Sequence, residues 1–193
     1  MKVDIIGTGL TAIIYDWSND SRKYSVGSAL GTYGDRIDTY FCMHKGQDIN
    51  TEKEVITLLN YPLEDIELRY KTNYFNNSIA YMIAYALYNG ATEINLWGCD
   101  AEKASEYEFE RPCIAYWIGI ANSLGCKVKN SSGLTEPPFK YGYEQSSISS
   151  FLEILSLREK AYRMYAEQKT GDEKQQWIGA MYAMQKMIDI IKG

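Results

Sequence analysis

The segment 76–100, NNSIAYMIAYALYNGATEINLWGCD, restricts the possible folds more than any other part of the chain. Its apolar residues recur first at three- and four-residue spacing, which predicts an amphipathic helix. These residues are Ile79, Met82, Ile83, Ala86 and Leu87. Gly90 then suits the left-handed position that ends a helix, and Glu93–Trp97 predicts a short strand. A helix that turns directly into a buried strand is typical of an α/β protein.

Polar residues stand at both ends of this helix–strand unit. Gly98 and Asp100 follow the strand, and ligands of open α/β sheets bind outside the carboxyl ends of the strands. Asp100 is therefore the first candidate for a ligand contact. Asn76, Asn77 and Ser78 stand at the start of the helix, where free N–H groups favour anions. Helix capping alone accounts for one of these three residues.

A glycine-bearing turn lies near the start of the chain. Gly7, Thr8 and Gly9 follow a predicted strand directly and precede a predicted helix over residues 10–17. This order begins many nucleotide-binding units, because glycines let the backbone approach a phosphate and the helix start offers N–H groups. Thr11 is then the candidate hydroxyl. A tight turn that binds nothing fits the same residues equally well.

Strand and helix patterns alternate through the first three quarters of the chain. We predict strands over residues 2–6, 23–26, 37–43, 65–70 and 126–128, and helices over 51–59 and 112–124. The helix over 51–59 rests on a capping box formed by Thr51 and Glu54. The alternation predicts a three-layer, Rossmann-like α/β domain over residues 1–145 with a mostly parallel sheet.

Two further candidate residues lie in this region. His44, the only histidine, closes the strand over 37–43, where it suits a general base, a phosphate partner or a plain strand end. Arg111 precedes Pro112 at a predicted helix start, where it suits a phosphate contact or a salt bridge to a nearby glutamate. The small polar residues 130–133 follow the last predicted strand and suggest pocket lining.

The pattern changes at about Ser147, where two apolar stripes at helical spacing follow each other around a turn at Thr170–Asp172. They predict an α-helical hairpin over residues 146–193. The hairpin has to bury its stripe against its own core or against the same hairpin of another subunit. We expect a homo-oligomer, most simply a symmetric dimer.

Composition narrows the classes of partner. The net charge is −5 without a basic run, which argues against nucleic-acid binding. No apolar run approaches the roughly 20 residues of a membrane span. The four cysteines form no CxxC pair, so we predict no structural metal site. Reduced thiols and an N-terminus that leads straight into a strand favour a cytoplasmic location.

The block SIAYMIAYALYNGATEINLWGCD resembles one shared by small bacterial sialyltransferases and the MptE-like 6-hydroxymethylpterin diphosphokinases. It is also similar to small Rossmann-like proteins from phage genomes. The resemblance covers about 25 residues, with weaker support over 5–11, and implies a Rossmann-like fold and group transfer. For a sialyltransferase it implies that Gly7, Thr8, Gly9 and Thr11 face donor phosphates, and that Asn77, Ser78 and Asp100 contact the nucleoside.

The alternative family role is diphosphoryl transfer from ATP. It implies Mg²⁺ as the cofactor, with Asp100 and one of Glu102 or Glu106 as candidate ligands. The sialyltransferases place a histidine base downstream of the Gly-x-Asp strand, and in this chain the single histidine lies upstream. The sequence therefore leaves open whether any reaction is catalysed.

Three functions remain in view. The favoured interpretation is a Rossmann-like protein that binds a nucleotide or nucleotide sugar; if it is an enzyme, the resemblance implies a glycosyl- or diphosphoryl-group transferase. A non-catalytic, phage-type protein that binds a nucleotide-derived signal is the second. An assembly protein that oligomerises through its helical hairpin is the third.

Overall fold

The computed structural model describes residues 1–100, 107–131 and 148–192. Its centre is a six-stranded sheet with the order β4-β3-β2-β1-β5-β6. The strands are β1 (Lys2–Ile6), β2 (Arg22–Val26), β3 (Thr39–Cys42), β4 (Glu54–Thr57), β5 (Glu93–Trp97) and β6 (Lys127–Asn130). Every neighbouring pair is parallel. The predicted α/β class with a mostly parallel sheet is therefore confirmed.

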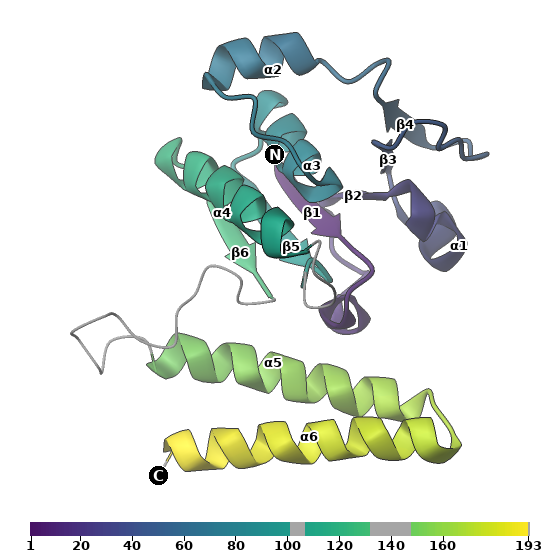
Figure 1. Ribbon diagram of the computed structural model, residues 1–193, viewed down its shortest axis with the longest axis vertical. Helices are drawn as coiled ribbons and strands as arrows, with labels where there is room; N and C mark the ends of the chain where they lie inside the picture. The colour runs from purple at the N-terminus through teal and green to yellow at the C-terminus, as the bar shows by residue number, and fades with distance from the viewer. Residues whose placement is uncertain (101–106, 132–147, 193) are drawn as a thin grey trace.

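Long helices cover one face of this sheet. α3 (Ser78–Tyr88) packs over β1, β2 and β3, and α4 (Tyr107–Ser123) packs beside α3 over β6 (Figure 1). The main core lies between them, where Val3 and Ile5 of β1 meet Ile83 of α3 and Trp117 of α4, all fully buried. Asn77 caps α3 by accepting a hydrogen bond from Ala80 N–H at 2.8 Å, as its position before the apolar stripe predicts.

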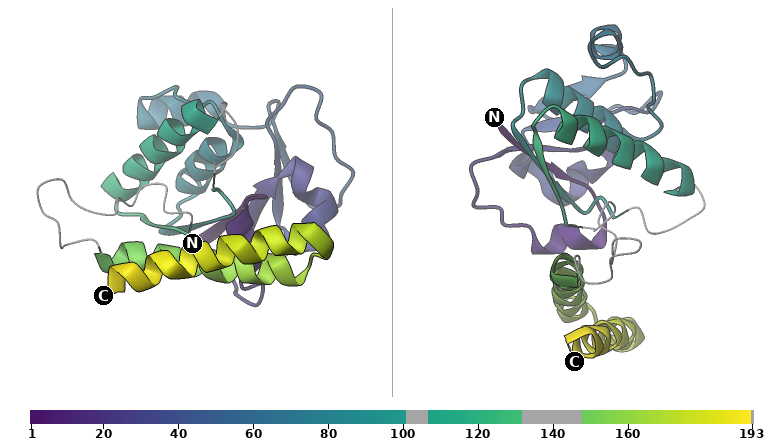
Figure 2. Two further views of the ribbon diagram at one scale, coloured as in Figure 1. Left: turned by 60° about the horizontal axis from the view of Figure 1, so that its bottom comes forward. Right: turned by 90° about the vertical axis from the view of Figure 1, so that its left-hand side faces the viewer.

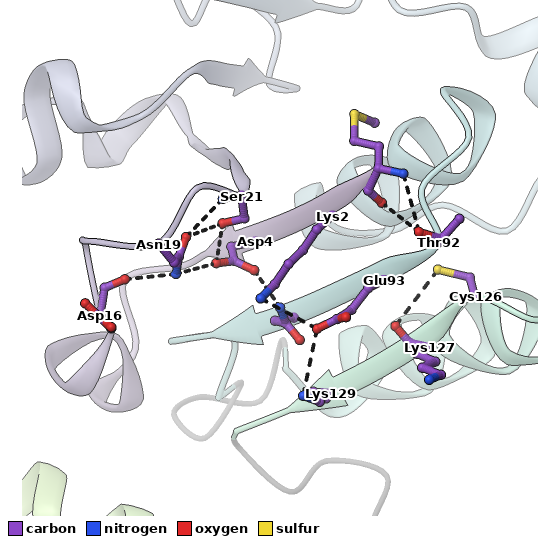
Figure 3. Close-up of polar contacts among 12 residues, drawn as sticks. Lys2, Asp4, Asp16, Asn19, Ser21, Thr92, Glu93, Cys126, Lys127 and Lys129 are labelled. Carbon is purple, nitrogen blue, oxygen red and sulfur yellow. Dashed lines mark hydrogen bonds and ion pairs between the residues drawn. The ribbon is translucent and has the colours of Figure 1, made fainter.

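The opposite face carries shorter elements. They are the 3-10 helices η1 (Leu10–Ile14), η2 (Gly27–Ala29) and η3 (Gly34–Arg36), and the one-turn helix α1 (Leu30–Tyr33). A small apolar cluster joins η1, η2 and α1 to Ile6 and Tyr40. Nearer the amino ends of β1 and β5 the same face is polar: Lys2, Asp4 and Glu93 stand on it (Figure 3). The two faces thus differ in both covering and polarity.

Two predicted elements are wrong: one predicted helix is a strand, and one predicted strand is a helix. Residues 54–57 form β4, because Val55 and Ile56 pair with β3 and Ile56 enters the core. Thr51 Oγ1 accepts from Lys53 N–H, so the expected capping box is absent. Residues 63–70 form α2 (Leu63–Tyr70) after Pro62, although their apolar residues alternate as in a strand. Leu68 at 80% exposure shows that this alternation does not reflect burial.

The predicted helix over 10–17 is also shortened, to the five residues of η1. Its end follows from Tyr15, which adopts an extended backbone and donates its hydroxyl to Asp4 Oδ2 at 2.7 Å. The helix predicted from Pro112 begins earlier, at Tyr107, so Pro112 and Arg111 lie inside α4. Arg111 is therefore not at a helix start.

The C-terminal hairpin is confirmed. It consists of α5 (Ile148–Glu167) and α6 (Gly171–Lys192), which lie against each other along their length (Figure 1). Figure 2 shows the pair beyond one end of the sheet, with α5 nearer to it. α5 packs on η1 of the same chain and buries Ile154 and Leu155. Among the described residues, no helix combines the length and apolar character needed to cross a bilayer.

Candidate functional site

The candidate site lies where the strand order reverses. β2, β3 and β4 extend from β1 to one side, and β5 and β6 extend to the other. The turns after β1 and β5 are therefore neighbours at the carboxyl edge, where ligands of open α/β sheets bind. Gly7 N–H donates to Trp97 O at 2.7 Å, and Gly9 N–H donates to Gly98 O at 2.8 Å. The structure thus brings the predicted Gly-x-Gly and Gly-x-Asp segments together.

The glycines are needed because the two turns touch. A Cβ on Gly9 would lie 2.5 Å from Asp100 Oδ2, and a Cβ on Gly7 would collide with Gly98 O. Gly98 has φ +63°, which disfavours other residues, and its Cβ would lie 2.7 Å from that of Ala12. The close backbone approach predicted for a phosphate is made instead by the neighbouring turn.

Asp100 is held by Thr11. The carboxylate is 4% exposed; its Oδ2 accepts from Thr11 N–H at 2.9 Å and its Oδ1 accepts from the Thr11 hydroxyl at 2.5 Å. Thr11 Oγ1 in turn accepts from Gly98 N–H at 2.8 Å. Ser131, at the end of β6, lies 3.2 Å from Thr11 Oγ1 and donates to Leu96 O. Asp100 therefore joins the turns of two strands and faces the protein.

Two titratable side chains that the sequence did not mark as candidates, Tyr33 and Cys99, border this cluster. The Tyr33 hydroxyl donates to Gly7 O at 2.6 Å, and burial raises the pKa of Tyr33 to about 12. Burial and then the charge of Asp100 raise the pKa of the Cys99 thiol to about 12. Both groups keep their protons at neutral pH, so Cys99 is not a thiolate nucleophile there.

The start of α3 lies at the same edge, because α3 runs back across the sheet before β5 begins. Asn76 Nδ2 donates to Phe109 O at 2.6 Å, and Asn77 Nδ2 donates to Glu110 O at 3.2 Å. These amides tie α3 to the first turns of α4 in addition to capping. Ser78 is half-buried beside them.

The remaining predicted residues are not part of the cluster. Thr8 is exposed at the tip of the first turn, and Arg111 is exposed on α4. His44 is exposed after β3, two strands from β1, and its carbonyl accepts from Gln47 N–H in a turn. The structure therefore does not place the histidine beside Asp100.

A second buried carboxylate lies on the polar face, in the middle of β1. Asp4 is 1% exposed, and its Oδ1 accepts from Asn95 Nδ2 at 2.6 Å. Its Oδ2 accepts from Asn19 and Ser21 (Figure 3) and also from the Tyr15 hydroxyl, and these bonds fix the loop before β2 to the sheet. Nothing in the sequence marked Asp4, because it stands inside an apolar strand.

The other features of the described residues are weaker candidates for a ligand site than the carboxyl edge. A shallow hollow of about 500 Å³ lies at the amino end of β2, lined by Asp20, Ser21, Arg22, Lys23 and Asp38. It is wide open and of mixed charge, unlike an enclosing ligand pocket. Within the described ranges no group of three or more His, Cys, Asp or Glu side chains can hold a metal ion. Glu102 and Glu106 lie outside those ranges.

Protein-family models, curated protein sequences and solved structures gave no match to this chain. The function therefore has to be argued from the geometry of the carboxyl edge.

Proposed function

We propose that this chain binds a nucleotide-type ligand at the carboxyl edge of its sheet, over the junction of β1 and β5. The observation that carries the proposal is the reversal of strand order at this junction. In open α/β sheets, ligands bind outside the carboxyl ends of the strands at the point where the strand order reverses.

The residues at the edge divide into a floor and a rim. Gly7, Gly9 and Gly98, with the Thr11–Asp100 pair, form a floor whose hydrogen bonds hold both turns. Rigid turns of this kind preorganise a binding surface. Asp100 acts there as a positioning residue.

The rim supplies the direct contacts. Thr8 is exposed between the two glycines, and the capped start of α3 favours a negatively charged group. Arg111 is exposed on the helix that Asn76 and Asn77 tie to α3, and a guanidinium binds phosphate oxygens in pairs. A phosphate-bearing ligand matches this combination.

Binding without turnover is favoured over group transfer. Both oxygens of Asp100 accept hydrogen bonds from Thr11, and Cys99 keeps its proton. Neither group is thereby poised as a general base or nucleophile. A Mg²⁺ ion bound to Asp100 for diphosphoryl transfer would have to share the carboxylate oxygens with Thr11, at a side chain that is only 4% exposed.

A thermal-shift screen tests the proposal with nucleoside mono-, di- and triphosphates, nucleotide sugars and cyclic nucleotides, each with and without Mg²⁺. A ligand at about 100 times its dissociation constant stabilises by about 2.7 kcal/mol, which raises Tm by several degrees. Mass analysis of the recovered ligand distinguishes an unchanged signal from a transferred group.

Two threonine variants locate the site. Thr8→Asp adds a negative charge at the exposed turn, and we expect it to abolish the shift by repelling phosphate. Thr92→Asp adds the same charge at an exposed position on the opposite, amino edge, and we expect the shift to remain. A shift that survives Thr8→Asp, or a blank screen with folded protein, refutes the proposal.

A further inference from the structure

The C-terminal hairpin rests on the element that carries Thr11. η1 lies at the carboxyl end of β1, and α5 lies directly beyond it (Figure 1). Among the described elements, α5 is the one that contacts η1 most extensively. The hairpin therefore meets the sheet domain at the same edge as the two turns that Thr11 and Asp100 join.

Two stripes of side chains run along α5. On the first, the rings of Tyr162 and Tyr165 pack on Trp177 of α6, with centroids 5.8 and 4.7 Å from it. At about 3.6 residues per turn, a second stripe lies roughly a quarter of a turn or more from the first. This docking stripe consists of Ile154, Leu157, Ala161 and Met164, at spacings of three, four and three residues. Ala161 is 0% exposed and Ile154 is 7% exposed, so the docking stripe is covered as well.

η1 offers apolar side chains to this stripe. Thr11 and Ala12 are buried against the sheet domain, whereas Leu10, Ile13 and Ile14 are half-buried. In the described ranges, the two apolar clusters of the sheet domain do not include these three side chains. Because α5 is the main neighbour of η1, they pack against the docking stripe.

η1 needs support from its neighbours. It is a 3-10 helix of five residues, and 3-10 helices have poor hydrogen-bond geometry and seldom run beyond three or four residues. Gly9 precedes it and makes no side-chain cap. The conformation of η1 therefore depends on the sheet domain on one side and on α5 on the other.

We propose that docking of the hairpin on η1 controls the carboxyl edge. While α5 rests on η1, the Thr11 N–H and hydroxyl stay on Asp100, and Thr11 Oγ1 stays on Gly98 N–H. When α5 leaves η1, these bonds lose their support and the two turns separate. The hairpin is thereby a conformational switch at the edge where we propose nucleotide binding, but the inference rests on these contacts and needs no ligand.

The contact between hairpin and sheet domain is small enough to open by itself. It joins a few side chains of η1 to the docking stripe, whereas the main core unites α3, α4 and the sheet. Openings that break few apolar contacts need less free energy than global unfolding. The hairpin can therefore leave η1 while the sheet stays folded.

Cys99 reports whether the two turns are joined. It stands between Gly98 and Asp100 and is 1% exposed. Cys113 is an internal reference, because it is 0% exposed and lies on α4, where its Sγ donates to Tyr74 O at 3.3 Å. Separation of the turns exposes Cys99 and leaves Cys113 covered, whereas global unfolding exposes both.

Iodoacetamide labelling of the full chain at pH 8, with mass analysis of the peptides, measures the modification rate of each cysteine. Ala161→Glu puts a charge at a fully buried position of the docking stripe, and glutamate preserves the helix. We expect Cys99 to react at least about tenfold faster than in the wild-type protein, and Cys113 at an unchanged rate. Ser156→Glu is the matched control, because it adds the same charge at an exposed position of α5. It should change neither rate.

Leu157→Ala repeats the test with a milder change, in case Ala161→Glu does not fold. It removes part of the docking stripe, and Cys99 alone should react about threefold faster. An unchanged Cys99 rate in a folded variant overturns the proposal. A parallel rise at Cys99 and Cys113 also overturns it, because the hairpin would then add only global stability. A blank ligand screen leaves the result intact, since no ligand enters the test.

Discussion

Asp4 and Asp100 are two buried carboxylates that the same sheet uses in different ways. Asp4 lies in the middle of β1 and takes hydrogen bonds from four side chains. Asp100 follows β5 and, among the described residues, takes both of its hydrogen bonds from Thr11. The donors around Asp4 largely have second acceptors. Tyr15 and Ser21 also reach Asn19 Oδ1, and Asn19 Nδ2 also reaches Asp16 O.

The Asp100 cluster lacks this redundancy. Thr11 N–H donates to Asp100 Oδ2, and the neighbouring Ser131 hydroxyl contacts the Thr11 hydroxyl, not this N–H. The comparison indicates that the Asp4 cluster tolerates the loss of one side chain better than the Asp100 cluster does. Four predictions, ordered by size, test this difference.

The largest effect is expected for Gly98→Ala. The new Cβ would lie 2.7 Å from Ala12 Cβ and 2.8 Å from Gly7 O, at a φ of +63°. Backbone strain and overpacking together should lower the free energy of unfolding by about 4 kcal/mol, measured by urea denaturation. Gly31→Ala is the control, because its Cβ would meet nothing within 4 Å in α1. It should change stability by less than about 1 kcal/mol, towards stabilisation. Similar values for both variants would contradict a close-packed edge.

The second prediction compares the carboxylates directly. Asp100→Ala leaves a buried backbone donor unsatisfied, and we expect a loss of about 3 kcal/mol. Asp4→Ala leaves Asn95 as the main unsatisfied group, and we expect about 2 kcal/mol. Urea denaturation of both variants under one set of conditions gives the order. If Asp4→Ala is the more damaging variant, the redundancy argument is wrong.

The third prediction concerns alkaline pH. In the folded protein the pKa of the Cys99 thiol is raised to about 12 from 9.0, first by burial and then by Asp100. The unfolded chain therefore releases this proton first, and the stabilisation present below pH 9 is lost as the pH rises towards about 12. Between pH 8 and 10, Cys99→Ala should lose about 1.4 kcal/mol less stability than the wild-type protein.

A thiol reagent checks the same point without unfolding. Cys99 should resist modification in the folded protein at pH 8, and should react once urea is added. Rapid modification of the folded protein at Cys99 would show that the edge cluster is open. In the Asp4 cluster, Tyr15 corresponds to Cys99, because its pKa is also raised mainly by burial.

The sequence predicted the sheet class because its strands stand in apolar runs next to helices with clear stripes, as in 76–100. It failed where local pattern and packing disagree. Residues 54–57 follow a capping-box pattern, but pairing with β3 outweighs it. Residues 65–70 alternate as in a strand, but Pro62, the early acidic residues and Arg69 near the end favour α2. Pairing with β3 therefore decides residues 54–57, whereas the proline and the charges at the two ends of the helix decide residues 63–70.

At the site, the sequence identified Gly7, Gly9, Thr11, Gly98 and Asp100 because glycine and small polar residues after strands mark the carboxyl edge. It did not predict that Thr11 and Asp100 bind each other, since the register of two strands 90 residues apart fixes that contact. The Asp4 cluster was missed for a different reason. A single polar residue in an apolar strand carries no signal of the donors that the fold brings to it.

The smallest effect is expected on the surface above the Asp4 cluster. Glu93 Oε1 lies 3.7 Å from Lys2 Nζ and 3.8 Å from Lys129 Nζ (Figure 3), and the Lys129 side chain is 76% exposed. Solvent and salt screen such pairs, so Lys129→Ala should lower the free energy of unfolding by about 0.5 kcal/mol or less, with a smaller effect in high salt. A loss as large as that for Asp4→Ala would mean that the lysines shield the buried Asn95 amide, whose Oδ1 has no hydrogen-bond partner among the described residues. The stability of the Asp4 cluster would then depend on the charged side chains of Lys2, Glu93 and Lys129. The neutral hydrogen-bond donors around Asp4 would not alone explain why the cluster tolerates substitution.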